Sequence, residues 1–177
     1  FCFGSDTHVC LHHFIGAEVL PYKLQPGNVN FELSYGCAGI ADYLTTIGRE
    51  LGGTGTERAA MQRAFNHFAR HEDTIAEQLL AYLRGKSAVR IIGQPHVANG
   101  NRVPTISFVV AEKNAESIVR HMDQFNIGIR FGDFYARRLI ATLGLADQGG
   151  VVRVSMAHYN TKDEIDTLIA RLDEVLP

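Results

Sequence analysis

Short strand-like and helix-like runs alternate from residue 88 to the end of the chain, and this order limits the possible folds more than any other feature. The strand-like runs are 89–93, 103–111, 127–131 and the run from Val151. The runs with apolar residues at helical spacing are 114–125, 134–143 and 161–172. Strands that alternate with helices in this way predict a small α+β domain, with a mixed or antiparallel sheet and helices on one face.

A long amphipathic run precedes this part of the chain. Its apolar stripe, which indicates one helix from Glu57 to Arg84, comprises Met61, Phe65, Phe68, Ile75, Leu79 and Leu83. Gly52 and Gly53 end an earlier helical run, Leu33–Leu51, and GGTGT at 52–56 lacks the Lys-Ser/Thr of a phosphate loop, so it reads as a linker. We therefore expect three parts: residues 1–55, a connecting helix at 56–85, and the α+β domain at 86–177.

Composition excludes several classes of function. The net charge of the 177 residues is −2 and no basic stripe is present, so we expect no nucleic-acid partner. No apolar run is long enough for a bilayer and no signal peptide is visible, so we expect no membrane partner. Three cysteines, Cys2, Cys10 and Cys37, favour a reducing compartment, and we expect a cytoplasmic protein. The aperiodic first 28 residues suggest a piece whose packing partner lies upstream.

One charged residue interrupts an apolar strand. In VVRVSMAHYNTKDEID, strand alternation places Val151, Arg153 and Ser155 on one face, and a capping box of Thr161 and Glu164 opens a helix. A guanidinium keeps its charge, so Arg153 needs an anion. That anion is either a nearby protein carboxylate, such as that of Asp133, or a substrate carboxylate held by the bidentate fork of the guanidinium.

Other clusters give weaker patterns. His8, Cys10, His12 and His13 lack the second ligand pair of a zinc site, and His67 and His71 lack the Glu of an HExxH motif. We predict no metal site and take His67 and His71 as solvated.

Two further features also predict no chemistry of their own. Arg137 and Arg138 are taken as a solvated helix face. No serine or cysteine lies in a nucleophile motif.

Two segments resemble a known family. They are PYKLQPGNVNFELSYGCAGIADYL (21–44) and IRFGDFYARRLIATLGL…GGVVRVSMAHYNTKDEIDTL (129–168). Together they resemble the class V aminotransferase and cysteine desulfurase family of fold-type I pyridoxal-phosphate enzymes, nearest the cysteine desulfurase-like branch. The resemblance implies the C-terminal part of a homodimeric enzyme that acts on an amino acid with pyridoxal 5'-phosphate.

The resemblance also implies roles for particular residues. Arg153 holds the position of the family's substrate-carboxylate arginine, and Arg130 that of a supporting arginine. Gly27 and Asn28 fall where the family reaches the cofactor phosphate across the dimer. Tyr135 stands in the place of the desulfurase cysteine, and a phenol cannot form a persulfide, so an aminotransferase or lyase reaction is expected in place of desulfuration.

The resemblance leaves one element of the chemistry unaccounted for. None of the four lysines (Lys23, Lys86, Lys113 and Lys162) has the context of the family's Schiff-base lysine. We therefore expect the chain to be inactive alone, with the missing N-terminal part of the same enzyme as its partner. The alternative is a stand-alone α+β module that binds another subunit without catalysis.

Overall fold

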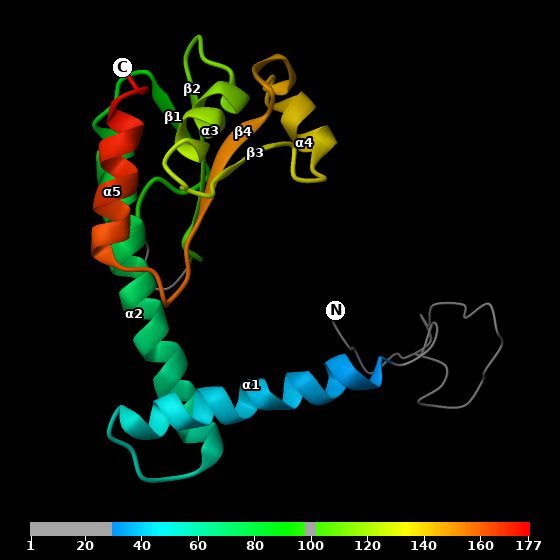
Figure 1. Ribbon diagram of the computed structural model, residues 1–177, viewed down its shortest axis with the longest axis vertical. Helices are drawn as coiled ribbons and strands as arrows, with labels where there is room; N and C mark the ends of the chain where they lie inside the picture. The colour runs from blue at the N-terminus through cyan, green and yellow to red at the C-terminus, as the bar shows by residue number, and fades with distance from the viewer. Residues whose placement is uncertain (1–29, 98–101) are drawn as a thin grey trace, which may run out of the picture. The chain divides into compact units, whose positions relative to one another are not determined.

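The structure is a computed structural model that describes residues 30–97 and 102–177 (Figure 1). Contacts divide the chain into two compact units, Phe1–Gln62 and Arg63–Pro177, and each is described by itself. These two units do not test the expected three parts (1–55, 56–85 and 86–177), which stay a prediction. None of the helices in the described ranges is both long and apolar enough to cross a membrane.

The first unit contains α1 (Phe31–Glu50) and the start of α2 (Glu57–Arg84). The Oδ1 atom of Asn30 caps α1 by accepting a hydrogen bond from the Leu33 amide at 2.8 Å. The two helices approach closely at Gly48, where an added Cβ would lie 1.9 Å from the Ala60 carbonyl oxygen. Residues 52–56 are non-helical, as the linker prediction required.

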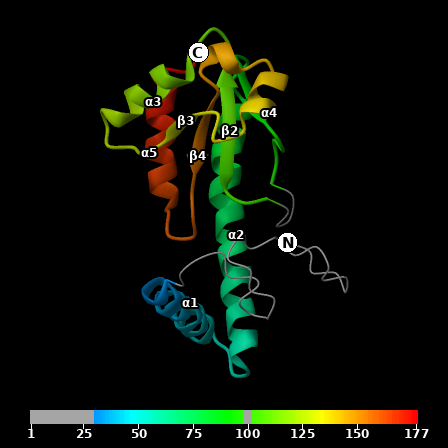
Figure 2. The same cartoon turned by 90° about the vertical axis from the view of Figure 1, so that its right-hand side faces the viewer.

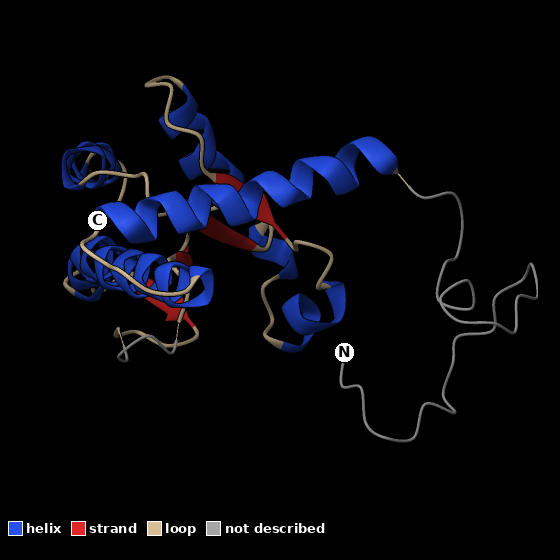
Figure 3. Cartoon of the chain, turned by 90° about the horizontal axis from the view of Figure 1, so that it is seen from below, coloured by secondary structure: helices blue, strands red, loops and turns tan. Residues whose placement is uncertain are grey.

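The second unit is built on one four-stranded sheet, whose strands are red in Figure 3. The strands are β1 (Val89–Ile92), β2 (Thr105–Val110), β3 (Arg130–Gly132) and β4 (Val151–Ser155). Their order is β1-β2-β4-β3, and every neighbouring pair is antiparallel. The helices are α3 (Ala115–Asp123), α4 (Arg137–Thr142) and α5 (Lys162–Asp173), with a 3-10 turn at Ala146–Gln148. The predicted α+β class is confirmed.

One face of the sheet carries the main core. Phe108 of β2 and Val152 of β4 are fully buried there against residues of α2, α3 and α5. The α2 contribution to this core includes Leu79 and Leu83 of the predicted stripe. Phe65, which the same stripe placed inward, is 54% exposed, so that part of the prediction was wrong.

The opposite face carries a smaller apolar cluster of Val109, Ile140, Leu145 and Val151. Because Ile140 belongs to α4, this short helix covers part of the second face. Figures 1 and 2 both show α4 and α5 on opposite sides of the sheet. The longer helices cover one face as predicted, and α4 is an addition on the other.

The ends of the elements differ from the prediction around one turn. The strand expected at 127–131 pairs only over Arg130–Gly132, and the helix expected from Phe134 begins at Arg137. The cause is local, because Phe134 and Tyr135 have left-handed backbone angles, with φ of 50° and 64°. A left-handed residue continues neither a strand nor a right-handed helix.

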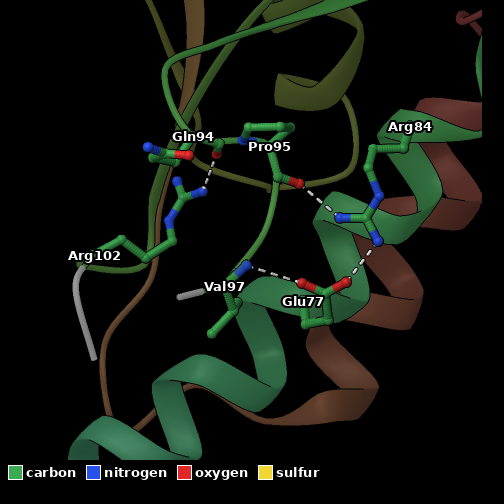
Figure 4. Close-up of polar contacts among 6 residues, drawn as sticks. All are labelled: Glu77, Arg84, Gln94, Pro95, Val97 and Arg102. Carbon is green, nitrogen blue, oxygen red and sulfur yellow. Dashed lines mark hydrogen bonds and ion pairs between the residues drawn. The ribbon is translucent and has the colours of Figure 1, made fainter. Parts of the chain in front are cut away.

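A carboxylate on α2 fixes the start of the segment that follows β1 (Figure 4). Glu77 accepts a hydrogen bond from Arg84 Nη2 at 2.5 Å and another from the Val97 amide at 3.1 Å. Arg84 Nη1 donates to the Pro95 carbonyl at 2.6 Å. The hydrogen bond from Arg84 is the main cause of a pKa of Glu77 below its ordinary value.

Replacing Glu77 with Gln should therefore reduce stability in a pH-dependent manner. A carboxyl group whose pKa is lower in the folded state stabilises the fold above its unfolded pKa of about 4.3, and this contribution is lost as the pH falls through the folded pKa. The pair is partly exposed and screened, so the loss at pH 7 should be at most about 1 kcal/mol. Urea unfolding measured across pH should give stability curves for wild type and Glu77→Gln that converge in acid. The control Glu50→Gln, on an exposed part of α1, should give the same curve as wild type.

Candidate functional site

Arg153 lies in the middle of β4 on the face that carries the smaller cluster. The neighbouring residues Val152 and Val154 point into the main core, so the predicted alternation is confirmed. The Arg153 side chain is half-buried, and its Nε atom is buried without a hydrogen-bond partner in the described structure. A buried guanidinium nitrogen without an acceptor is costly, so this position favours an external anion.

Register places polar and charged residues beside Arg153. Ser107 of β2 and Arg130 of β3 are its direct cross-strand partners. Side chains directly opposite in antiparallel strands lie about 4.5–5.5 Å apart at Cβ, and like charges there are destabilising. Two arginines brought together by register create a locally positive spot, which an anion between them would relieve. Arg130 is exposed, and its Nη1 donates to the adjacent Ile129 carbonyl at 3.0 Å.

Other arginines of the same unit show what a structural arginine looks like. Arg102 donates to the Gln94 carbonyl at 2.5 Å and to the Thr105 carbonyl at 3.0 Å (Figure 4 shows the first of these). Arg120 is within 2.5 Å of the Glu116 carboxylate. Arg153 makes no such bond or ion pair in residues 30–97 and 102–177, which separates it from this group.

The sequence left open an ion pair between Arg153 and Asp133. In the structure, Asp133 has other partners: its Oδ1 accepts from the Tyr135 amide at 3.0 Å, and its Oδ2 lies 3.8 Å from Nε of Arg137. The described part of the chain therefore gives no support to an internal partner for Arg153. Arg137 is 90% exposed, as expected for a solvated helix face.

Contacts to α2 hold the segment that follows β4. The ring of His158 stacks on Phe68 with centroids 3.9 Å apart, and Nε2 of His71 lies 2.7 Å from the Asn160 carbonyl oxygen. His71 is thus a packing residue and not a fully solvated one. The predicted capping box at Thr161 and Glu164 is present and starts α5. These contacts anchor the C-terminal end of the strand that carries Arg153.

The turn after β3 has an unusual conformation. Tyr135 is fully exposed, with a φ of 64°, and follows Phe134, which is also left-handed. The Asp133 carboxylate accepts the Tyr135 amide and closes the turn. Left-handed conformations cost a non-glycine residue about 1–2 kcal/mol, so this turn holds strain.

Replacing Tyr135 with Gly should stabilise the protein. The exposed ring loses no buried contact, and glycine adopts the left-handed angle freely, although it is more flexible when unfolded. We expect a gain of about 0.5–1 kcal/mol in the free energy of unfolding, measured by urea denaturation. Tyr159→Gly is the matched control, since Tyr159 is exposed without a positive φ, and this change should destabilise.

Several predicted residues lie outside the described ranges. They are Cys2, His8, Cys10, His12, His13, Lys23, Gly27 and Asn28. Among the residues that are described, no three His, Cys, Asp or Glu side chains come together as a metal site. The prediction for the cofactor phosphate at Gly27 and Asn28 therefore stays a prediction.

The described residues do not make a site for pyridoxal phosphate by themselves. Lys86 Nζ lies 2.6 Å from the Asp173 carboxylate and also donates to the Leu176 carbonyl at 3.4 Å. Both partners lie at the C-terminal end of the chain, beside the main core. Lys162 is the first residue of α5 and Lys113 lies two residues before α3, and both are exposed. Lys86 therefore already has a protein carboxylate as its partner, and the other two lysines lie at the surface.

Sequence reasoning missed two residues of this site. Phe134 lies over the Arg153 guanidinium, with its ring centroid 3.8 Å from Cζ, and Ser107 flanks Arg153 on β2. The register that aligns Ser107 with Arg153 has no sequence signature. The DF pair in RFGDFY could have suggested a turn, but an aromatic residue at a left-handed angle is not a turn signal.

Comparison with known proteins shows the family to which the chain belongs. The family model described as aminotransferase class-V matches residues 2–168. The chain is 38% identical over 117 residues to the "Aminotransferase-like protein FGM3" of Gibberella zeae, covering 65% of this chain and 29% of that protein. It is 28% identical to the "Cysteine desulfurase-like protein ustD" of Aspergillus flavus, covering 93% of this chain and 35% of that protein.

Solved structures show the same fold. The apo structure of the cysteine desulfurase from Thermococcus onnurineus matches with a TM-score of 0.56 at 21% identity, covering 70% of this chain and 32% of that one. The chain spans about a third of the length of the curated relatives it matches. It belongs to the class V aminotransferase family, whose members are pyridoxal-phosphate enzymes.

Proposed function

We propose that this chain supplies the carboxylate-binding part of a pyridoxal-phosphate enzyme that acts on an amino acid. Arg153 is the principal contact and Arg130 supports it. The observation that carries the proposal is the half-buried Arg153, whose Nε has no hydrogen-bond partner in the described structure and whose cross-strand partner on β3 is a second arginine, Arg130. A carboxylate there would gain charge-assisted hydrogen bonds and relieve the repulsion between the two guanidinium groups.

The role of Arg153 is to bind and orient. A planar guanidinium holds a planar carboxylate in one plane, which fixes the remaining bonds at the substrate Cα. The cofactor supplies an electron sink for breaking one of those bonds. We propose that the lysine that holds the cofactor belongs to a part of the enzyme outside the described residues, in keeping with a chain that spans about a third of its relatives' length. A second copy of the enzyme is proposed as the homodimer partner.

Transamination or elimination is proposed over desulfuration. Tyr135 occupies the position that the resemblance gives to the desulfurase cysteine, and a phenol has no sulfur to accept a persulfide. Cys37, an exposed residue of α1, is the free cysteine within the described ranges, and it is 98 positions earlier in the chain (135 minus 37).

Chemical modification of arginine tests the proposal without an activity assay. The full-length protein is treated with phenylglyoxal, with and without sodium acetate as a carboxylate probe, and each arginine is followed by peptide mass spectrometry. We expect acetate to slow the modification of Arg153 and to leave Arg90, an exposed arginine of β1, unchanged. Equal rates at Arg153 with and without acetate would contradict carboxylate binding there.

A further inference from the structure

The aromatic residue that covers Arg153 is held there at a cost to its own backbone. Phe134 has a φ of 50°, in a region that a bulky side chain seldom adopts. Gly132, with a φ of 127°, allows the chain to leave β3, and the Asp133 carboxylate closes the turn on the Tyr135 amide. Strain of this kind persists only where the surrounding structure enforces it, and it concentrates at functional positions.

Two contacts fix the Phe134 ring. It packs against the smaller cluster of Val109, Ile140, Leu145 and Val151. It also covers the Arg153 guanidinium, with Cζ 3.8 Å from the ring centroid. A guanidinium stacked on an aromatic face still presents its in-plane N–H groups, so the stack does not compete with a carboxylate bound at the edge.

We propose that Phe134 is a positioning residue for Arg153: the strained turn after β3 holds the Phe134 ring on the guanidinium face, so that the plane of the guanidinium is set before a carboxylate arrives. The proposal rests on the proposed function of Arg153. Pre-orientation lowers the entropy that Arg153 loses on binding, because a free arginine side chain samples many rotamers. The ring face also stabilises the positive charge of a guanidinium whose buried Nε has no hydrogen-bond partner in the described structure.

Substitutions at Phe134 in the full-length protein separate this role from simple packing. Phe134→Leu and Phe134→Met keep an apolar side chain for the smaller cluster and remove the π face, whereas Phe134→Tyr keeps the face. Phe131→Leu is the matched control. Phe131 is on β3, three residues before Phe134, its cross-strand partner Val152 faces the main core, and its own side chain is 38% exposed.

The readouts are phenylglyoxal modification of Arg153, its protection by sodium acetate, and the KM for an amino-acid substrate. For Phe134→Leu and Phe134→Met we expect Arg153 to react about threefold to tenfold faster with phenylglyoxal. Protection by acetate should weaken, and the KM should rise, by a similar factor. The value of kcat should change less than KM, because the carboxylate is bound equally in the ground and transition states. Phe134→Tyr should restore wild-type values, and Phe131→Leu should not differ from wild type.

The outcomes separate this inference from the proposed function. If the Phe134→Leu and Phe134→Met variants match Phe131→Leu while acetate still protects Arg153, the positioning role is refuted and carboxylate binding stands. If acetate fails to protect Arg153 in the wild-type protein, the proposed function itself fails. Should both aliphatic variants unfold, the wild-type comparison decides: Arg153 must react more slowly than its cross-strand neighbour Arg130, and equal rates would refute shielding by the ring.

Discussion

Replacing Arg153 with Ala in the full-length enzyme should raise the KM for its amino-acid substrate by about two to three orders of magnitude. Removing one partner of a hydrogen-bonded charge pair costs about 2–5 kcal/mol, and each 1.4 kcal/mol is a factor of ten. Arg153→Lys keeps the charge but loses the fork, so its KM should fall between those of wild type and Arg153→Ala. Steady-state kinetics with several L-amino acids measures both.

The control for this prediction is Arg137→Ala. Arg137 lies in the same unit and is 90% exposed, and its Nε lies 3.8 Å from the Asp133 carboxylate. This change should leave KM within about twofold of wild type, as expected for an exposed pair. If Arg153→Ala gave kinetics equal to those of Arg137→Ala, the guanidinium would have no part in substrate binding.

Replacing Gly150 with Ala should destabilise the fold by at least about 3 kcal/mol. Gly150 has a φ of 83°, and an added Cβ would lie 2.3 Å from the Gly132 carbonyl oxygen. The left-handed angle and the Gly132 carbonyl are both features of the backbone, so the clash cannot be relieved by moving a side chain. The free energy of unfolding from urea denaturation measures the change.

Gly128→Ala provides the comparison for Gly150→Ala. Gly128 has no positive φ, and an added Cβ there meets nothing within 4 Å. Its replacement should change stability by less than about 1 kcal/mol. Similar losses of stability at Gly128 and Gly150 would show that Gly150 has room for a methyl group, and that β3 and the start of β4 do not approach each other this closely.

The elements that the sequence predicts well are those with a strong local pattern. The bounds of α2, Glu57–Arg84, agree with the predicted long helix, because its apolar stripe and the following Gly85 are local features. The Thr161 capping box and the alternation around Arg153 were also predicted correctly. Each of these depends on residues within a few positions of one another.

The features that could not be predicted depend on register or on strain. Arg130 and Arg153 are 23 positions apart (153 minus 130), and only strand pairing makes them neighbours. The left-handed angles at Phe134 and Tyr135 shorten a predicted strand and delay a predicted helix, and neither residue type favours that conformation. The position of α4 on the second face comes after this turn, and the six residues of α4 are too few to show an apolar period that would predict it.

The most direct test is a crystal structure of the full-length protein with an L-amino acid such as L-alanine bound. Our prediction is that the substrate carboxylate lies in the plane of the Arg153 guanidinium, with oxygen-to-nitrogen distances of about 2.7–2.9 Å, and with the Phe134 ring still stacked on the guanidinium. A carboxylate held by other side chains, with Arg153 paired to a protein Asp or Glu, would contradict it.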